Sequence, residues 1–273
     1  MKKLLFLLVV LALCIPLTVG ASAATEQDYP AVTLRASGKT LSVTARRVEG
    51  HTFVPLRAFS DLFTDVTYRY DAKTSYATLT APGLTILAGN GASMLFANER
   101  CLWGVKTNRL LNGTMWVPLN PLVKALGLKA DGTGSSSTRT ISGSYRAITP
   151  ASQYYNQNDL YWLSRIVSAE SRGEPIQGQI AVGNVILNRV RSRNFPNTVY
   201  GVVFQTGQFS PVSNGTIYNS PAWVSVCVAK MCLEGYAVNN DVLFFCNLAK
   251  SPSNWIVRNR TRAFTIGSHT FFY

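Results

Sequence analysis

The spacing of apolar residues along the chain predicts two different kinds of structure. In the first half, apolar and polar residues alternate in short runs, as in residues 74–80 and 84–87, which is typical of half-buried strands. From Leu160 onward, apolar residues recur at three- and four-residue steps, which predicts helices with a buried face. We therefore expect an α+β protein with more than one domain.

The first half contains an internal repeat. Residues 50–59 recur as residues 113–122, and each copy reads as a strand, a Val-Pro-Leu entry into a short helix, and a further strand. Pro55 and Pro118 are expected in the first turn of that helix, where a missing N–H costs little. Because one copy cannot bury its apolar face alone, we expect the two to pair. A last strand is predicted at 138–142.

Three helices are expected in the second half. The first begins at Leu160, with Asn158 or Asp159 as its cap. The third begins at Ser220-Pro221, with Ser220 as the cap and Pro221 in the first turn, and ends before Gly235. The second has a core stripe in which a glycine would allow close packing against a neighbouring helix. That stripe consists of Ile176, Ile180, Gly183, Leu187 and Val190.

The N-terminus has the pattern of an export signal over residues 1–23. Two lysines precede an apolar run at 4–19, and the small residues 21–23 form a cleavage motif. A retained membrane anchor is the alternative, because the run approaches the length that spans a bilayer. The small-residue motif follows directly and no positive cluster does, which favours cleavage. We expect a secreted protein with no stable membrane span.

The charge and the cysteine content of the chain limit the classes of ligand that it is expected to bind. The formal net charge of +13 favours polyanions. Since the chain has an export signal and no basic-helix or zinc motif, we expect anionic cell wall polymer rather than nucleic acid. Four cysteines remain after cleavage, and they allow three pairings or buried free thiols. Their spacing is unlike that of a zinc site, and we expect no metal and no cofactor. They are Cys101, Cys227, Cys232 and Cys246.

Glu170 is the candidate catalytic residue. It ends the first helix of the second half, on the same stripe as Leu163, Ile166 and Val167. Partial burial raises the pKa of a carboxyl group, as a general acid near neutral pH requires. A solvated glutamate at a fraying helix end is the alternative. Glu174 is expected to serve as a cap or first-turn charge for the next helix.

Four further residues are candidates for substrate binding. Arg172 is close enough in sequence to orient Glu170 or a substrate carboxylate, although a surface arginine fits equally well. Gln208 can donate and accept hydrogen bonds to a sugar, and Phe209 can stack on a pyranose ring, both on a loop. Residues 243–247 are predicted as a strand that brings Asn247 to its end.

The second half resembles the SleB/CwlJ family of cell wall hydrolases, which are spore-cortex-lytic. Residues 158–273 carry the resemblance through four segments in the family's order, listed at the end of this paragraph. It implies a small, mostly α-helical, lysozyme-like fold with a short β element and Glu170 as the acid. Family members usually have proline after the asparagine at 247, where this chain has Leu248. The segments are 169–190, 207–212, 243–247 and 267–273.

The first half, residues 31–143, resembles the module named after the N-terminal domain of copper amine oxidases. His51 stands alone with no carboxylate at ligand spacing, so the name implies no copper here. A wall-binding or spacer role is expected for this module. Residues 144–157 lack periodicity and are expected to link it to the catalytic domain.

The acids of the second half bear on the mechanism. A glycosidase that uses two carboxylates needs the second at a set distance, and none is an obvious partner for Glu170. A lytic transglycosylase needs one acid, which agrees with what the resemblance implies for the muramic acid–N-acetylglucosamine bond of spore cortex or vegetative wall. The alternatives are a hydrolytic muramidase or glucosaminidase, an N-acetylmuramoyl-L-alanine amidase using Cys246 with His269, and a non-catalytic wall-binding protein. The acids are Asp159, Glu170, Glu174, Glu234 and Asp241.

Overall fold

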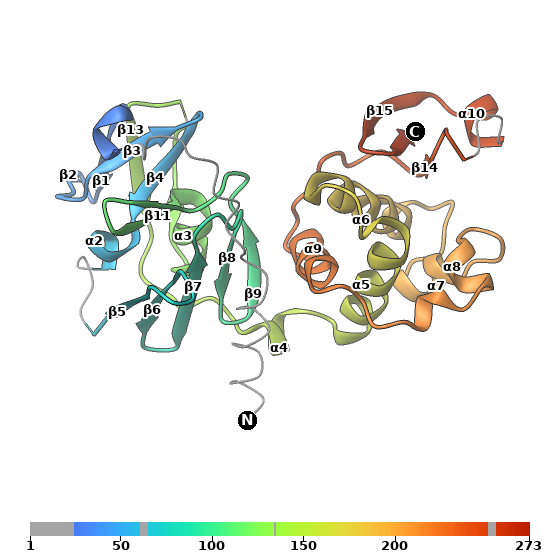
Figure 1. The fold of residues 1–273 in the computed structure, drawn as a ribbon, viewed down its shortest axis with the longest axis horizontal. Coiled ribbons are helices and arrows are strands. Elements are labelled where there is room, and N and C mark those ends of the chain that lie inside the picture. The colour runs from blue at the N-terminus through green and yellow to red at the C-terminus, as the bar shows by residue number, and fades with distance from the viewer. Residues whose placement is uncertain (1–24, 61–64, 134, 251–254) are drawn as a thin grey trace. The chain divides into compact units, whose positions relative to one another are not determined.

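The computed structural model describes residues 25–60, 65–133, 135–250 and 255–273, and it divides into two compact units (Figure 1). The first unit ends at Ala151 and the second begins at Ser152. The export signal expected at 1–23 lies outside the described residues. Within those residues, no helix has the length and apolar character needed to cross a bilayer.

The first unit is rich in strands. One sheet contains β1 Ala31–Ala36, β2 Lys39–Thr40, β3 Ala45–Val48, β4 His51–Pro55, β10 Arg109–Leu111, β11 Thr114–Pro118, β12 Lys129–Ala130 and β13 Thr138–Ser142. Its order is β10-β11-β4-β3-β1-β13-β12, with β2 beside β1, and β1 and β13 run parallel. A second, antiparallel sheet follows chain order: β5 Thr67–Asp71, β6 Tyr76–Ala81, β7 Leu84–Gly89, β8 Met94–Ala97 and β9 Arg100–Trp103. The strand expected at 138–142 is confirmed as β13.

Short helices join these strands: η1 Glu26–Asp28, α2 Leu56–Ser60 and α3 Leu119–Ala125. β4 leads directly into α2, and β11 leads into α3. The prediction that Pro55 and Pro118 lie in the first turn is wrong by one residue. Both end their strands, and Pro118 is the N-cap of α3 with an extended ψ of 136°. Fixed φ suits a proline on either side of that boundary, so sequence alone does not place it.

The second unit is mainly helical, with a small antiparallel sheet of order β14-β16-β15. Its helices are α4 Ala151–Tyr154, α5 Gln157–Ser171, α6 Ile176–Arg191, α7 Val199–Val203, α8 Ser210–Ser213, η2 Thr216–Tyr218, α9 Trp223–Leu233 and α10 Trp255–Asn259. Its strands are β14 Phe244–Cys246, β15 Arg262–Ile266 and β16 His269–Phe272. α5, α6 and α9 pack against one another (Figure 1). The strand expected at 243–247 is confirmed, one residue shorter at each end.

Two expected helix starts are displaced. Asn156, not Asn158 or Asp159, caps α5, because its side-chain oxygen accepts hydrogen bonds from both of those backbone N–H groups. α9 begins at Trp223 after Ala222, so the Ser220-Pro221 pair lies before the helix.

The core stripe expected on α6 is only partly correct, because this helix is buried on most sides. Ile180 and Gly183 are fully covered, whereas Ile176, Leu187 and Val190 are partly exposed. The buried face instead carries Ala181, Val182 and Val185, which pack with Phe271 and Val242.

The role expected for Gly183 is confirmed. A Cβ there would lie 2.6 Å from Cys232 Sγ on α9, so only glycine allows this approach. None of the four described cysteines forms a disulfide; Cys246 is partly exposed, and the other three are buried. The choice left open by the sequence is thus resolved in favour of free thiols.

Candidate active site

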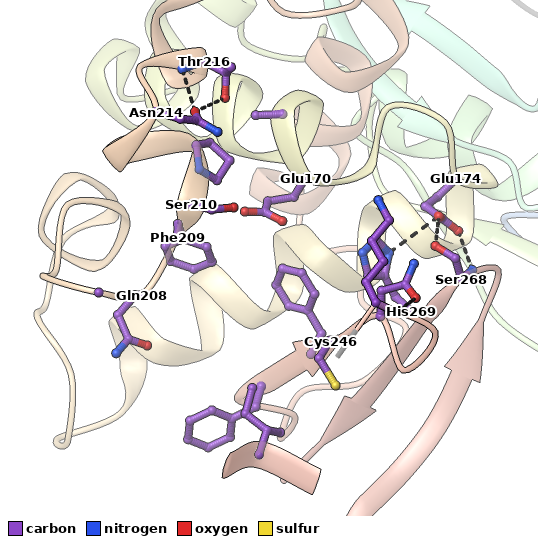
Figure 2. Close-up of a pocket in the computed structure, with 18 of the residues that line it drawn as sticks. Glu170, Glu174, Gln208, Phe209, Ser210, Asn214, Thr216, Cys246, Ser268 and His269 are labelled. Atoms are coloured by element: carbon purple, nitrogen blue, oxygen red, sulfur yellow. Dashed lines mark hydrogen bonds and ion pairs between the residues drawn. The ribbon is translucent and has the colours of Figure 1, made fainter. Parts of the chain in front are cut away.

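A cavity of about 780 Å³ lies in the second unit (Figure 2). It is bounded by the end of α5, the turn before α6, the loop around α8, and the sheet β14–β16. Its lining includes Ala169, Glu170, Glu174, Arg189, Gly207, Gln208, Phe209, Ser210, Pro211, Asn214, Thr216, Phe244, Phe245, Cys246, Asn247, Lys250, Trp255, Ile256, Ser268 and His269. Four of the five predicted site residues are therefore brought together in one cavity: Glu170, Gln208, Phe209 and Asn247.

Glu170 lies in the last turn of α5 and is partly buried. Ile166 and Val167, one turn earlier, are fully buried, so the helix face that carries the carboxyl group points inward. Burial raises the pKa of Glu170 to about 7. In Figure 2 the Glu170 and Ser210 side chains point toward one another. A carboxyl group in this setting exchanges its proton near neutral pH.

Glu174 faces the same cavity, and its expected role as a helix cap is wrong. Pro175 is the N-cap of α6, with no side-chain cap hydrogen bond. The Glu174 carboxylate instead accepts hydrogen bonds from the backbone N–H of Ser268 at 2.9 Å and from the Ser268 hydroxyl. Although burial raises the pKa of Glu174, these bonds and the nearby His269 hold it below its ordinary value. Glu174 is therefore an anion at neutral pH.

His269 is packed, as expected from the sequence. It is 7% exposed and sits edge-on to the Phe245 ring, with ring centroids 5.3 Å apart. Its Nδ1 lies 3.7 Å from Glu174 Oε1 and has no hydrogen-bond partner among the described residues. Burial lowers the pKa of His269, more than the Glu174 charge raises it. The imidazole is therefore mainly neutral at pH 7.

Gln208 and Phe209 lie on the loop that enters α8. Gln208 is exposed, and its backbone N–H closes a turn onto Gln205 O at 3.2 Å. Phe209 is 7% exposed, with its ring centroid 6.4 Å from that of Phe245. The loop therefore presents an exposed amide side chain beside a packed ring.

Asn247 and Arg172 differ in placement. Asn247 follows β14, and its side-chain oxygen accepts hydrogen bonds from the backbone N–H groups of Ala249 and Lys250, at 3.0 and 3.3 Å. Arg172 is exposed at the C-cap of α5 and is not part of the cavity lining. The structure therefore does not bring Arg172 together with the other predicted site residues.

Arg189 lies within the family segment 169–190 and lines the cavity, although it was not among the site residues predicted from the sequence. It lies at the end of α6, only 4% exposed. Its Nε donates to Leu243 O at 2.7 Å, and its Nη1 donates to Gln208 Oε1 at 3.0 Å. Burial lowers its pKa to about 10, so it remains a cation at neutral pH. The helix pattern offered no signal for it, because Arg191, two residues further along the same helix, is exposed.

No cluster of three His, Cys, Asp or Glu residues suited to a metal ion occurs in the described part of the chain. Cys246 and His269 both line the cavity. Glu234, a further acid of this unit, accepts a hydrogen bond from the Tyr155 hydroxyl at 2.7 Å, away from the cavity.

Comparison with known proteins identifies both halves. Residues 173–272 match the Cell Wall Hydrolase family model, and residues 33–141 match the copper amine oxidase N-terminal domain. A spore cortex-lytic enzyme of Bacillus cereus is 40% identical over 117 residues, which are 43% of this chain and 45% of the relative. A spore cortex-lytic enzyme of Bacillus subtilis is 36% identical over 117 residues, or 43% of this chain and 38% of the relative. The chain thus matches less than half the length of these relatives.

Among solved structures, one titled as the catalytic domain of a germination-specific lytic transglycosylase, SleB from Bacillus anthracis, is 36% identical. The match covers 44% of this chain and 98% of that one, with a TM-score of 0.41. The family match begins three residues after Glu170 and includes Gln208, Phe209 and Asn247. The second unit therefore contains a region that matches the Cell Wall Hydrolase family, and the first a region that matches the copper amine oxidase N-terminal domain.

Proposed function

We propose that the second unit is a lytic transglycosylase that cleaves the bond between N-acetylmuramic acid and N-acetylglucosamine in the peptidoglycan of spore cortex or cell wall. The observation that carries this proposal is the environment of Glu170. Its carboxyl group is partly buried in a large cavity, and burial raises the pKa of this group to about 7. A group with this pKa can both donate and accept a proton near neutral pH. The names of the related spore cortex-lytic and transglycosylase proteins agree with this chemistry.

In the proposed reaction, Glu170 alone moves the proton. The protonated carboxyl group donates its proton to the glycosidic oxygen as the bond from that oxygen to the muramic C1 breaks. The resulting carboxylate then accepts the proton of the muramic C6 hydroxyl, whose oxygen bonds to C1. Glu170 ends protonated, as it began, and the product carries a 1,6-anhydromuramoyl end. No water is consumed.

The state of Glu174 favours this route over two-carboxylate hydrolysis. Glu174 is the other carboxylate that lines the cavity in the described part of the chain. Each of its oxygens accepts a hydrogen bond from Ser268. These hydrogen bonds stabilise the anion and hold its pKa below the ordinary value, so Glu174 is a weaker base and nucleophile than a free carboxylate. We therefore assign Glu174 a structural role, in which it holds the turn at Ser268 against the turn before α6.

The remaining predicted residues would bind the glycan around Glu170. Gln208 offers a side-chain amide at the edge of the cavity, Phe209 an aromatic edge, and Asn247 an amide beside β14. Arg172 lies outside the cavity and would reach only a glycan that extends past the end of α5. A helical domain with its acid at the end of a buried helix agrees with a lysozyme-like arrangement.

For the first unit we propose a duplicated module that binds the wall. Val54 and Val117 are 63 positions apart, which is the offset of the sequence repeat, and they lie directly opposite each other in β4 and β11. Antiparallel pairing centred on equivalent residues is what two copies related by a local twofold axis would produce. The formal net charge of +13, of which Lys2 and Lys3 in the expected export signal contribute +2, suits a secreted protein held on anionic wall polymer.

Mass spectrometry of products from cortex and vegetative peptidoglycan tests the activity. Wild type is expected to release anhydromuramoyl ends, and Glu170→Gln is expected to release none. Asp241→Asn is the control, because this exposed acid lies outside the cavity lining. Reducing ends from wild type that disappear in Glu174→Gln would instead support the hydrolase. Released stem peptides would support the amidase with Cys246 and His269, and would overturn the proposal.

A further inference from the structure

Arg189 is a buried cation without an acidic partner. Among the described residues, no Asp or Glu forms an ion pair with it, although it is only 4% exposed. Aromatic rings surround the guanidinium, which lies 4.8 Å from the Phe195 ring centroid, 5.3 Å from Phe209 and 5.2 Å from Phe244. Burying a charge in this way is costly unless its donors are used. Two of them are used, by Leu243 O and by Gln208.

The contact with Arg189 fixes the orientation of the Gln208 side chain. A guanidinium has donors only, so the amide must turn its oxygen toward Arg189. The Gln208 Nε2 amino group is then the end that remains for a ligand, and it also is a donor. Arg189 Nη2 has no hydrogen-bond partner among the described residues. Since both residues line the cavity, the pair presents mainly N–H donors to it.

The residues around Arg189 and Gln208 limit which chemical groups of a ligand this pair can bind. Phe209 and Phe244 line the cavity beside the guanidinium, so an apolar surface adjoins the donors. A carbonyl oxygen next to a methyl group matches both features. In Figure 2 the Phe209 ring lies between Gln208 and Glu170. In this view Gln208 therefore lies on the far side of the Phe209 ring from the Glu170 carboxyl group.

We propose that Arg189 and Gln208 form a subsite for the acetamido group of a substrate hexosamine, with the carbonyl oxygen on their N–H donors and the methyl group against Phe209 and Phe244. This inference rests on the proposed function, because it takes the ligand to be a glycan strand. Glycan that retains its N-acetyl groups is the substrate. A de-N-acetylated hexosamine lacks the acceptor and places an ammonium group near the Arg189 cation.

Binding of the full chain to insoluble peptidoglycan tests this subsite without turnover. The Glu170→Gln protein is sedimented with native glycan, with chemically de-N-acetylated glycan, and with glycan that has been de-N-acetylated and then re-N-acetylated. About 1 M salt shortens the Debye length to ~3 Å, which screens general repulsion between the basic protein and amino groups. We expect de-N-acetylation to weaken binding about tenfold or more, and re-N-acetylation to restore it. Equal binding to all three would overturn the proposal.

Gln208→Glu, added to Glu170→Gln, tests the pair itself. The new carboxylate keeps an acceptor toward Arg189 but removes the outward amide donor. Because residue 208 is exposed on a loop, the variant is expected to fold. Binding to native glycan should fall about tenfold, and most of the discrimination against de-N-acetylated glycan should be lost. Gln177→Glu is the matched control, since it adds the same charge at an exposed position outside the cavity lining.

Two outcomes would contradict the assignment. Full discrimination retained by Gln208→Glu would mean that the pair does not contact the acetamido group. Binding that depends on free muramic carboxylates, and not on N-acetylation, would mean that the pair takes a carboxylate. Either result would leave the proposed bond cleavage intact, because anhydromuramoyl ends released by wild type report that reaction separately.

Discussion

Glu174 accepts hydrogen bonds from both the backbone N–H and the hydroxyl of Ser268, although 94 residues separate the two in sequence. The contact fastens the turn between β15 and β16 onto the turn that precedes α6. Next to it, Gly267 has a φ of 57°, and a Cβ there would lie 1.8 Å from Glu174 Oε2. The Glu174 carboxylate thus holds in place the hairpin that positions His269 in the cavity.

Gly267→Ala should therefore destabilise the second unit. The left-handed backbone costs about 1 kcal/mol for alanine, and displacing Glu174 from Ser268 costs about 1–3 kcal/mol more. Urea unfolding should show a loss of about 2–4 kcal/mol in the free energy of unfolding. Gly215→Ala is the matched control, because Gly215 has a φ of 78° and a Cβ there meets nothing within 4 Å. Equal losses in the two variants would mean that the contact with Glu174 adds nothing.

The raised pKa of Glu170 predicts how activity depends on pH. The proposed reaction begins with the protonated carboxyl group, and burial raises its pKa to about 7. Release of soluble fragments should therefore decline above about pH 7, approaching a tenfold loss per pH unit. Initial rates measured from pH 5 to 9 at constant ionic strength test this. Rates that keep rising to pH 9 would exclude Glu170 as the proton donor.

The same pKa predicts that Glu170 lowers stability at alkaline pH. Below about pH 4.5 the group is protonated in both the folded and the unfolded states, so it contributes no difference. As pH rises from 4.5 to 7, only the unfolded chain ionises, and the folded state loses up to about 3 kcal/mol. Glu170→Gln should therefore be more stable than wild type at pH 8 and equally stable at pH 4. Urea unfolding at both values measures this, and a variant that is less stable at pH 8 would contradict it.

Features of the fold that neighbouring residues in the sequence determine could be predicted, and features that tertiary packing determines could not. β14 follows from a short apolar run and β13 from the polar turn that precedes it, and each was predicted to within a residue. The start of α5 was not, because Asn156, Asn158 and Asp159 are all good caps and only the backbone geometry selects the first. The core stripe predicted on α6 was only partly correct for another reason. Since α5, α9 and the small sheet surround this helix, no single face of it is the core face.

The residues of the candidate site likewise divide into those that the sequence predicts and those that only the packed structure reveals. Glu170 could be predicted because helical periodicity places it with buried neighbours and the family resemblance favours it over a solvated glutamate at a helix end. The Glu174 contact was not, since its partner lies on a hairpin far along the chain and nothing near Glu174 indicates it. Arg189 was expected to be structural and was not predicted as a site residue, because the sequence does not show which of the two arginines in the last turn of α6 is buried beside the cavity. Only the packed structure shows that Leu243 and Gln208 take up its donors.

The burial of the thiols predicts selective alkylation. Of the four described cysteines, Cys246 is the partly exposed one and lines the cavity. Burial raises the pKa of Cys232 to about 12, which leaves little thiolate to react. Iodoacetamide should modify Cys246 in the folded protein and all four in urea, as read by peptide mass spectrometry. Bound glycan should protect Cys246. Rapid labelling of Cys232 in the folded protein would contradict its burial.

Gly183 and Cys232 should be energetically coupled, because they hold α6 against α9. A Cβ at position 183 would lie 2.6 Å from the Cys232 sulfur, which in turn contacts Ile180 O at 3.7 Å. Gly183→Ala gains about 1 kcal/mol of helix propensity but overpacks a buried contact, at a cost of about 1–3 kcal/mol. We expect a net loss of up to about 2 kcal/mol in the free energy of unfolding.

Cys232→Ala removes the colliding sulfur, so it should rescue Gly183→Ala. In a double-mutant cycle measured by urea unfolding, the double variant should be more stable than the sum of the single changes by about 1 kcal/mol or more. Gly173→Ala is the control, because a Cβ there meets nothing within 4 Å, and it should change stability by less than about 1 kcal/mol. Strict additivity would show that α6 and α9 shift apart to admit the methyl group, and that the glycine is not what sets their separation.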